Sequence, residues 1–148
     1  MTEELPRLPA MLFPISTKWE DTAIARSFNG WVWSVEGCPD QSNAVASVSG
    51  ALDLVSPANR KQDEKLPFPA EFGNTFGPLA CLAGSNDDLF ALAQGIGAVQ
   101  PRLYITCGTE DFFYEDNKHF VQTFSGRLNI TYEELSGSHA CCSDGKAV

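Results

Sequence analysis

The order of elements in the last third of the chain constrains the fold most strongly. Residues 102–107, RLYITC, have the apolar, β-branched character of a strand, and residues 115–124 have helical spacing, with Phe120 and Phe124 on one face. Residues 128–135, LNITYEEL, alternate as a second strand. A strand, a helix and a further strand in this order predict the crossover unit of a parallel sheet. We therefore expect an α/β protein.

Earlier segments fit the same architecture. TAIA at 22–25 and VASVS at 45–49 are short runs of the kind found in the centre of a parallel sheet that is covered on both faces. SNDDLFALAQ at 85–94 opens with a capping residue and two aspartates and predicts a short helix. Leucines at helical spacing predict a short amphipathic helix within 2–12, although it contains two prolines, and the proline-rich segment 56–78 predicts a long surface excursion.

Length and charge limit the classes of protein that the chain can belong to. With 148 residues and 43% hydrophobic content, residues 1–148 are expected to form one domain. The 10 basic and 19 acidic residues give a net charge of -9, which argues against nucleic acid or an anionic membrane surface as partner. The sequence has no apolar run long enough to span a membrane and no leader pattern, so we expect a cytoplasmic protein.

The cysteines predict neither a disulfide framework nor a metal site. Their number is odd and their spacing fits no known pattern, so we interpret them as reduced thiols: Cys38, Cys81, Cys107, Cys141 and Cys142. His139 with the adjacent pair Cys141 and Cys142 would still lack a fourth zinc ligand, and neighbouring cysteines rarely face one ion.

Two loops that follow strands carry residues with catalytic potential. In open α/β sheets, functional groups gather at the carboxyl ends of the strands. Asp111 follows the strand at 102–107, where its carboxylate could orient an imidazole, and His139 follows the last strand behind the small residues of SGSH at 136–139. An acid followed by a histidine matches the last two members of a catalytic triad whose residues come in the chain order Ser, Asp, His.

Each of these residues also has a structural interpretation. An aspartate after a strand often caps a helix or forms a turn, and Glu110, Glu115 and Asp116 are neighbouring acids that could take its place. A histidine in a glycine and serine loop is commonly just solvated. We expect His119, on the predicted helix at 115–124, to be solvated as well.

Several segments together resemble a known family. SGALDL at 49–54, FGNTFG at 72–77, ITCGTEDFFYEDN at 105–117 and SGSH at 136–139 are similar to the esterase D and tributyrin esterase branch of the α/β-hydrolases, which includes enzymes like S-formylglutathione hydrolase. The likeness covers most of 1–25 and 44–139. It implies a partial α/β-hydrolase fold, a mostly parallel sheet flanked by helices, in a chain that starts late and lacks the first strands and one oxyanion-hole loop.

The resemblance also implies a chemistry. The family's catalytic acid matches Asp111 and its general base matches His139, the substrates are short-chain acyl esters or thioesters, and no metal or organic cofactor is used. The nucleophile should lie on an elbow of the form GLSMGGYG directly after the strand at 22–25. In this chain the nucleophile's place is occupied by Phe28, and Ser27, one position away, is a weak substitute flanked by bulky residues.

The segment 26–43 has an explanation at the level of codons. Residues 26–42, RSFNGWVWSVEGCPDQS, can be written as codons that encode GLSMGGYGALKAALTNP when they are read one base later. That is the family's elbow and the helix behind it, so we interpret 26–43 as translated out of frame. The tail at 140–148, ACCSDGKAV, departs from the family's tryptophan-rich pattern and is suspected of the same origin.

These observations predict descent from a serine carboxylesterase whose elbow is lost in this chain. The main alternative is a catalytically inactive fragment, or a noncatalytic module that associates with itself through an exposed sheet edge. A weaker alternative is a small binding module in which Trp31 and Trp33 stack on a ligand.

Overall fold

The computed structural model describes residues 18–27, 43–56, 74, 76–78, 81–97 and 100–139. The helix predicted within 2–12, the elbow segment from Phe28 to residue 42, most of the excursion at 56–78 and the tail at 140–148 lie outside these residues.

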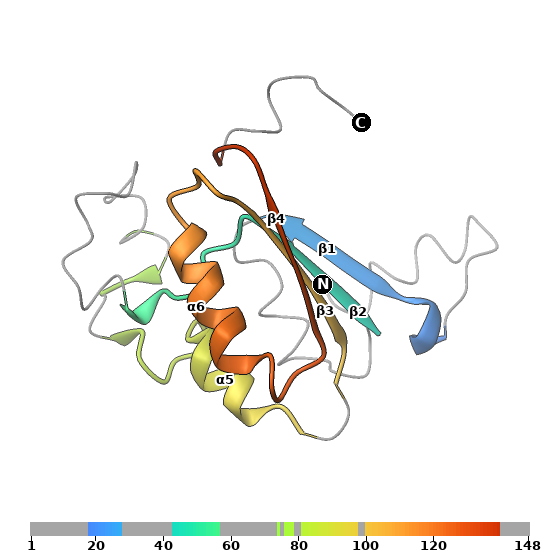
Figure 1. Cartoon of the computed structure of the whole chain (residues 1–148). Helices are drawn as coiled ribbons and strands as arrows, with labels where there is room; N and C mark the ends of the chain where they lie inside the picture. The colour runs from blue at the N-terminus through green and yellow to red at the C-terminus, as the bar shows by residue number, and fades with distance from the viewer. Residues whose placement is uncertain are drawn as a thin grey trace.

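The described residues form a parallel sheet with its strands in sequence order (Figure 1). The strands are β1 at Ala23–Ser27, β2 at Ala44–Val48, β3 at Arg102–Gly108 and β4 at Ile130–Leu135. Each pairs in parallel with the next, and the register aligns Val45 with Leu103 and Leu103 with Ile130. All four strands predicted from the sequence are therefore confirmed, to within one or two residues at each end.

Two helices cover one face of this sheet. Helix α5 spans Leu89–Gly95 and α6 spans Tyr114–Phe124, and both lie on the same side of the strands in Figure 1. Alternate side chains of β2 and β3 point to these helices, because successive residues of a strand face opposite sides. The main core cluster joins the two layers: Val45, Leu52, Leu89, Ala93, Leu103, Ile105, Phe120, Phe124 and Leu128. The predicted placement of Phe120 and Phe124 on one face of the helix is confirmed, and that face is buried.

Helix α5 begins later than the sequence predicts. Ser85 was the expected cap, but the residues from 81 to 87 form turns, and the side chain of Asp88 caps the helix by accepting the backbone N–H of Ala91. The second carboxylate oxygen of Asp88 accepts the N–H of Gly84, which fixes the turn that precedes the helix. A carboxylate can accept hydrogen bonds from two backbone donors at once. Because Asp88 does so, the helix begins at Leu89 and not directly after Ser85.

Strand β1 lies at an edge of the described sheet, and the prediction of a central, covered strand is wrong for these residues. The side chains of Ala23 and Ala25 are exposed, and no further strand pairs with β1 within the part of the chain that the structure describes. A run of small apolar residues fits both a central and an edge strand, so its sequence could not separate the two places.

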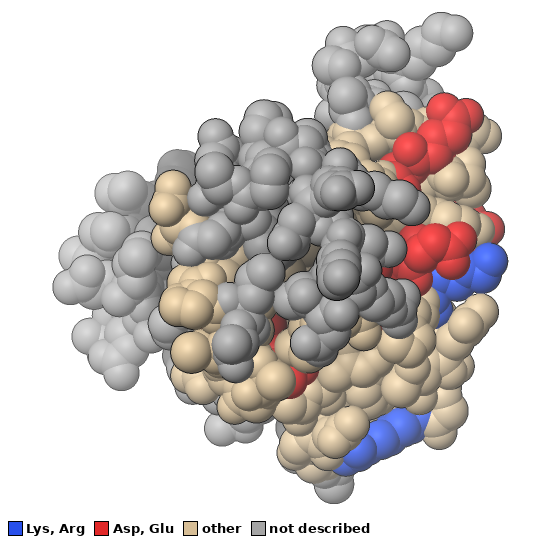
Figure 2. Space-filling model, turned by 90° about the vertical axis from the view of Figure 1, so that its left-hand side faces the viewer, with Lys and Arg blue, Asp and Glu red and all other residues tan. Residues whose placement is uncertain are grey.

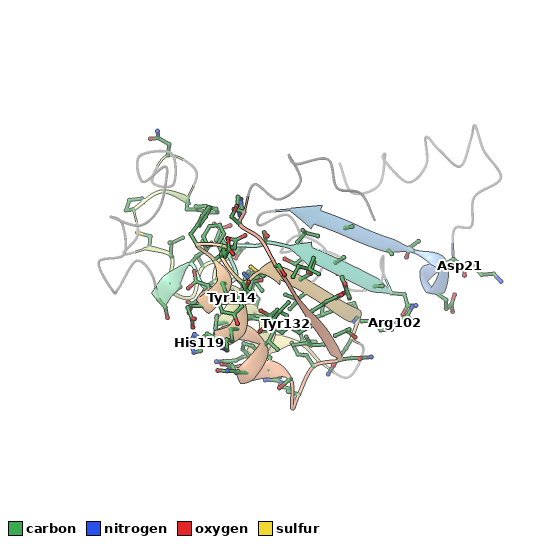
Figure 3. The ribbon with its side chains drawn as sticks, turned by 45° about the horizontal axis from the view of Figure 1, so that its top comes forward. Asp21, Arg102, Tyr114, His119 and Tyr132 are labelled. Atoms are coloured by element: carbon green, nitrogen blue, oxygen red, sulfur yellow. The ribbon has the colours of Figure 1, made fainter. Side chains whose placement is uncertain are left out.

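The two ends of the sheet differ in character. A short 3-10 helix at Trp19–Asp21 precedes β1, and Figure 3 shows Asp21 and Arg102 at the end where the strands begin. Tyr114 lies near the opposite, carboxyl end of the sheet in the same view. The loops that follow β2, β3 and β4 meet at that carboxyl end.

Candidate functional site

The loops after β3 and β4 are in direct backbone contact. The N–H of Thr109 donates to the carbonyl of Leu135 at 2.8 Å, and the N–H of Glu110 donates to the carbonyl of Gly137 at 3.0 Å. A Cβ atom added to Gly108 would lie 2.2 Å from the carbonyl oxygen of Gly137, so only glycine allows this approach. Gly137 has φ of 133°, which other residues rarely adopt.

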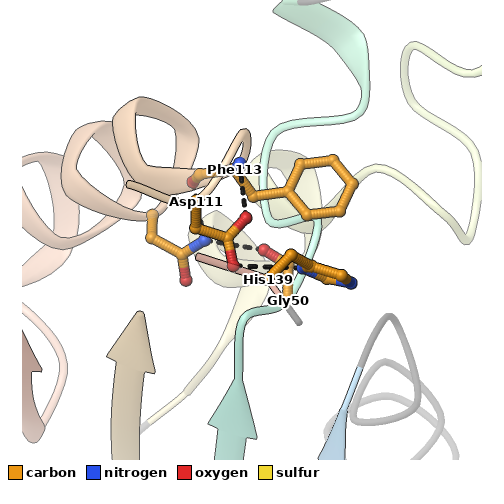
Figure 4. Close-up of polar contacts among 5 residues, drawn as sticks. Gly50, Asp111, Phe113 and His139 are labelled. Atoms are coloured by element: carbon orange, nitrogen blue, oxygen red, sulfur yellow. Dashed lines mark hydrogen bonds and ion pairs between the residues drawn. The ribbon is translucent and has the colours of Figure 1, made fainter. Parts of the chain in front are cut away.

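This contact brings Asp111 and His139 together (Figure 4). Nδ1 of His139 lies 3.0 Å from Oδ2 of Asp111, across 28 residues of sequence. The Asp111 side chain is fully buried, whereas the imidazole is 30% exposed. Oδ1 of Asp111 accepts the backbone N–H of Phe113 at 2.9 Å, so both carboxylate oxygens are held in place. A carboxylate facing Nδ1 favours the tautomer with its proton on that nitrogen, which leaves Nε2 able to accept a proton.

Aromatic rings complete the surroundings of the imidazole. The ring centroid of Phe112 lies 4.4 Å from that of His139 at a tilt of 37°, and the ring of Phe113 lies 5.7 Å away and edge-on. Phe113 is buried, whereas Phe112 is exposed. Of the neighbouring acids, Glu110 and Glu115 are also exposed.

The end of β1 lies on the same side of the molecule as this pair. Ser27 is the last residue of β1 and pairs with Val48 at the end of β2. Because parallel strands end at the same edge of a sheet, the carboxyl end of β1 lies at the edge that carries Asp111 and His139. The side chain of Ser27 and the whole of Phe28 lie outside the described residues, so their catalytic assignments stay predictions.

The side chain of His119 is 45% exposed, so it is solvated as expected, but it also has a partner that the sequence did not predict. Its Nδ1 lies 2.9 Å from Oδ2 of Asp53, and its ring lies 5.0 Å from that of Phe90. Asp53 is buried and also accepts the N–H of Ser56 at 2.9 Å. A buried carboxylate requires partners, and helix α6 supplies one, His119, across 66 residues of sequence. Figure 3 shows His119 on the helix layer, whereas His139 belongs to the loop after β4.

Sequence reasoning missed Asn117, a fully buried polar residue on α6. Its Nδ2 donates to the carbonyl oxygens of Gly50 at 2.7 Å and Phe113 at 2.8 Å, which ties together the loops after β2 and β3. The signal that could have found it is its position: Asn117 interrupts the apolar face formed by Phe113, Phe120 and Phe124. A polar residue at a core position of a helix usually has a specific partner.

Cys107 lies at the end of β3, next to the acidic residue of the pair. Burial raises the pKa of its thiol to about 12, and the negative charge of Asp111 adds to this effect. The side chain is only 1% exposed. A neutral, buried thiol is a poor nucleophile, so Cys107 has a packing role at this edge of the sheet.

Metal clusters, surface charge and apolar helices are the other features of the described residues that bear on function. Among the described residues, no cluster of three or more His, Cys, Asp or Glu side chains could hold a metal ion. Figure 2 shows acidic side chains gathered along one side of the visible face, with the basic side chains in small separate patches. No helix within the described ranges has the length and apolar character needed to span a membrane.

Known proteins with similar sequences or structures include esterases and serine hydrolases. No family model matches the chain. An acetyl esterase of Caldicellulosiruptor saccharolyticus is 28% identical over 146 residues, which is 92% of this chain and 54% of that protein. The chain therefore spans about half the length of this curated relative.

Two solved structures from Staphylococcus aureus are similar in fold. S-formylglutathione hydrolase FrmB matches with a TM-score of 0.70 and 24% identity, and the fluorophosphonate-binding serine hydrolase FphF matches with 0.67 and 22%. Each match covers 92% of this chain and 54% of the other. The parallel sheet, its helices and these likenesses show that the chain has a partial α/β-hydrolase fold, and its sequence is similar to that of an acetyl esterase.

Proposed function

We propose that this site belongs to a serine carboxylesterase that hydrolyses short-chain acyl esters or thioesters. The observation that carries the proposal is the contact between a fully buried Asp111 and a part-exposed His139 at the carboxyl ends of neighbouring strands. This arrangement leaves Nε2 of His139 as a proton acceptor near solvent, and Asp111 stabilises the imidazolium that forms. The kinship with an acetyl esterase supports the same chemistry.

The proposed mechanism combines these two residues with the serine of the elbow that the resemblance implies. A serine hydroxyl after β1 attacks the acyl carbonyl while His139 takes its proton, and the tetrahedral intermediate collapses when His139 returns that proton to the leaving alcohol or thiol. Water then attacks the acyl-enzyme with His139 as base, releasing the acid and the serine. Phe28 occupies the nucleophile's place, so we propose that the chain as written retains the acid and base but does not turn over.

The test restores the elbow and then removes the acid and base. The chain as written should hydrolyse 4-nitrophenyl acetate at the background rate, whereas the chain with residues 26–35 replaced by GLSMGGYGAL should hydrolyse it. In the restored chain, His139→Ala should lower kcat by about 10³-fold or more, and Asp111→Asn should also lower it strongly. His119→Ala removes the other aspartate-paired histidine and is the matched control. A folded, restored chain that is inactive, or one that is indifferent to His139→Ala, would contradict the proposal.

A noncatalytic role in self-association is the second candidate. β1 is an edge strand within the described residues, with Ala23 and Ala25 exposed, and exposed edges invite pairing with another chain. Large hydrophobic side chains on the face opposite the helices are also exposed: Val48, Tyr104 and Leu135. We expect a concentration-dependent dimer in sedimentation equilibrium, weakened by Ala25→Lys. A monomer at all concentrations would exclude this role.

A further inference from the structure

Asn117 is the buried polar side chain that joins the loops around the Asp111–His139 pair. It has no exposed surface, and its Nδ2 group donates to two backbone carbonyls, those of Gly50 after β2 and Phe113 after β3. Its Oδ1 atom has no hydrogen-bond partner in the described part of the chain. An acceptor that is buried without a partner costs free energy. The stabilising contribution of this side chain therefore comes from its two donated hydrogen bonds.

The orientation of this amide follows from its partners. Both neighbouring groups are carbonyl oxygens, which only accept hydrogen bonds, so the nitrogen of Asn117 must face them. An ionised aspartate of the same shape would place a carboxylate against two carbonyl oxygens. A leucine of similar size would leave both carbonyls without the donor.

A short path of bonds leads from Asn117 to the catalytic pair. Asn117 holds the carbonyl of Phe113 through Nδ2, and the N–H of Phe113 donates to Oδ1 of Asp111. The other oxygen of Asp111 faces Nδ1 of His139. The buried ring of Phe113 packs with Ala51 and Leu54 of the loop after β2, the loop whose Gly50 carbonyl Asn117 also holds.

We propose that Asn117 is a positioning residue for the Asp111–His139 pair. It fixes the turn at 111–113 against the loop after β2, and through the N–H of Phe113 it fixes the carboxylate that selects the tautomer of His139. The catalytic meaning of this role rests on the proposed function. The positioning itself is a property of the fold and can be measured without any turnover.

The first test reads the tautomer of His139 by ¹⁵N NMR in the chain as written. The chain has two histidines, so His119→Gln assigns both sets of ring signals. In the parent, neutral His139 should carry its proton mainly on Nδ1. In Asn117→Leu and Asn117→Asp, the Nε2–H share should rise for His139 and stay unchanged for His119.

Asn43 supplies the matched control. Its Nδ2 also donates to a backbone carbonyl, that of Glu20 at 3.0 Å, but it lies just before β2, at the other end of the sheet. Asn43→Leu and Asn43→Asp should therefore leave the tautomers of both histidines unchanged. These two control variants show whether a change in the His139 tautomer requires loss of the Asn117 amide, which holds the turn at 111–113, or follows from the loss of any hydrogen-bonded side-chain amide.

The second test measures kinetics in the chain with the restored elbow. Asn117→Leu should lower kcat by about ten- to a hundredfold with little change in KM, because a misplaced acid and base slow the chemical step rather than binding. If the restored chain is inactive while the tautomer of His139 responds, the proposed function fails and the positioning role stands.

Three results would overturn the inference. In the first, the tautomer of His139 is unchanged in folded Asn117 variants. In the second, both histidines change to the same extent, which would mean general loosening of the fold. In the third, neither Asn117 variant folds, because a residue whose task is positioning must be removable without loss of the fold.

Discussion

Single residues at the carboxyl end of the sheet are constrained by backbone contact as much as by chemistry. Gly108 and Gly137 let two loops touch, and that touch is what places His139 beside Asp111. Neither glycine carries a reacting group. They affect the site because Gly108 has no side chain to keep the loops apart and Gly137 can adopt a backbone conformation that other residues rarely adopt.

Substitution of Gly108 tests this constraint. In Gly108→Ala, the new methyl group would lie 2.2 Å from the carbonyl oxygen of Gly137, so the loop after β4 must move away. We expect a loss of about 1–3 kcal/mol in the free energy of unfolding, measured by urea denaturation. Gly126→Ala is the control, because a Cβ there meets nothing within 4 Å. Equal stability of the two variants would show that the loops are not in contact.

The buried thiol of Cys107 makes a prediction about pH. Its pKa, raised to about 12 by burial, lies above the ordinary cysteine value of about 8.5 that the unfolded chain would show. The unfolded state therefore loses this proton first, and the contribution of Cys107 to stability falls as pH rises from about 8.5 toward 12.

The rate of alkylation tests whether the thiol of Cys107 is buried and neutral in the folded protein. At pH 8, iodoacetamide should modify Cys107 far more slowly than the exposed Cys81, with the two peptides quantified by mass spectrometry. In denaturant the two rates should converge. A fast reaction of Cys107 in the folded protein would contradict its buried, neutral state.

At the scale of elements, the helices are held by specific polar contacts at their ends and on their buried faces. Helix α6 is fixed to the loop after β2 twice, through Asn117 to the carbonyl of Gly50 and through His119 to Asp53. Helix α5 is fixed by its capping aspartate, Asp88, which also orders the preceding turn.

Removal of the α5 cap should destabilise the protein by a predictable amount. Asp88→Ala leaves the N–H groups of Ala91 and Gly84 without their acceptor, and we expect a cost of about 0.5–2 kcal/mol in the free energy of unfolding. The neighbouring Asp87→Ala removes the same charge without the cap and should change stability much less. Thermal and urea unfolding of both variants would check this, and equal losses would count against capping as the cause.

At the scale of the whole molecule, the sequence predicted the order of the strands and helices well. It did not predict the side-chain contacts between residues far apart in the chain. Apolar runs placed all four strands, because strand formation depends largely on local hydrophobic pattern. The start of α5 was misplaced, because either Ser85 or Asp88 could cap it, and only the turn at Gly84 decides between them.

For the site, strand-end placement predicted that Asp111 and His139 would meet, and the structure has them in contact. Their catalytic roles stay predictions. The contacts of Asn117 with Gly50 and of His119 with Asp53 join residues 67 and 66 positions apart. No local sequence pattern specifies such contacts, because they depend on how α6 packs against the loop after β2.

The position of β4 has a consequence for how the protein is made. It is the last of the described strands in sequence and lies at the edge of the described sheet beside β3, and the loop that follows it carries His139. During synthesis, β1, β2 and β3 leave the ribosome first and can begin to pair, whereas Asp111 has no imidazole beside it until β4 has docked. A released chain truncated before residue 130 should therefore keep the bond from the N–H of Phe113 to Asp111 but leave Oδ2 of Asp111 without its imidazole partner.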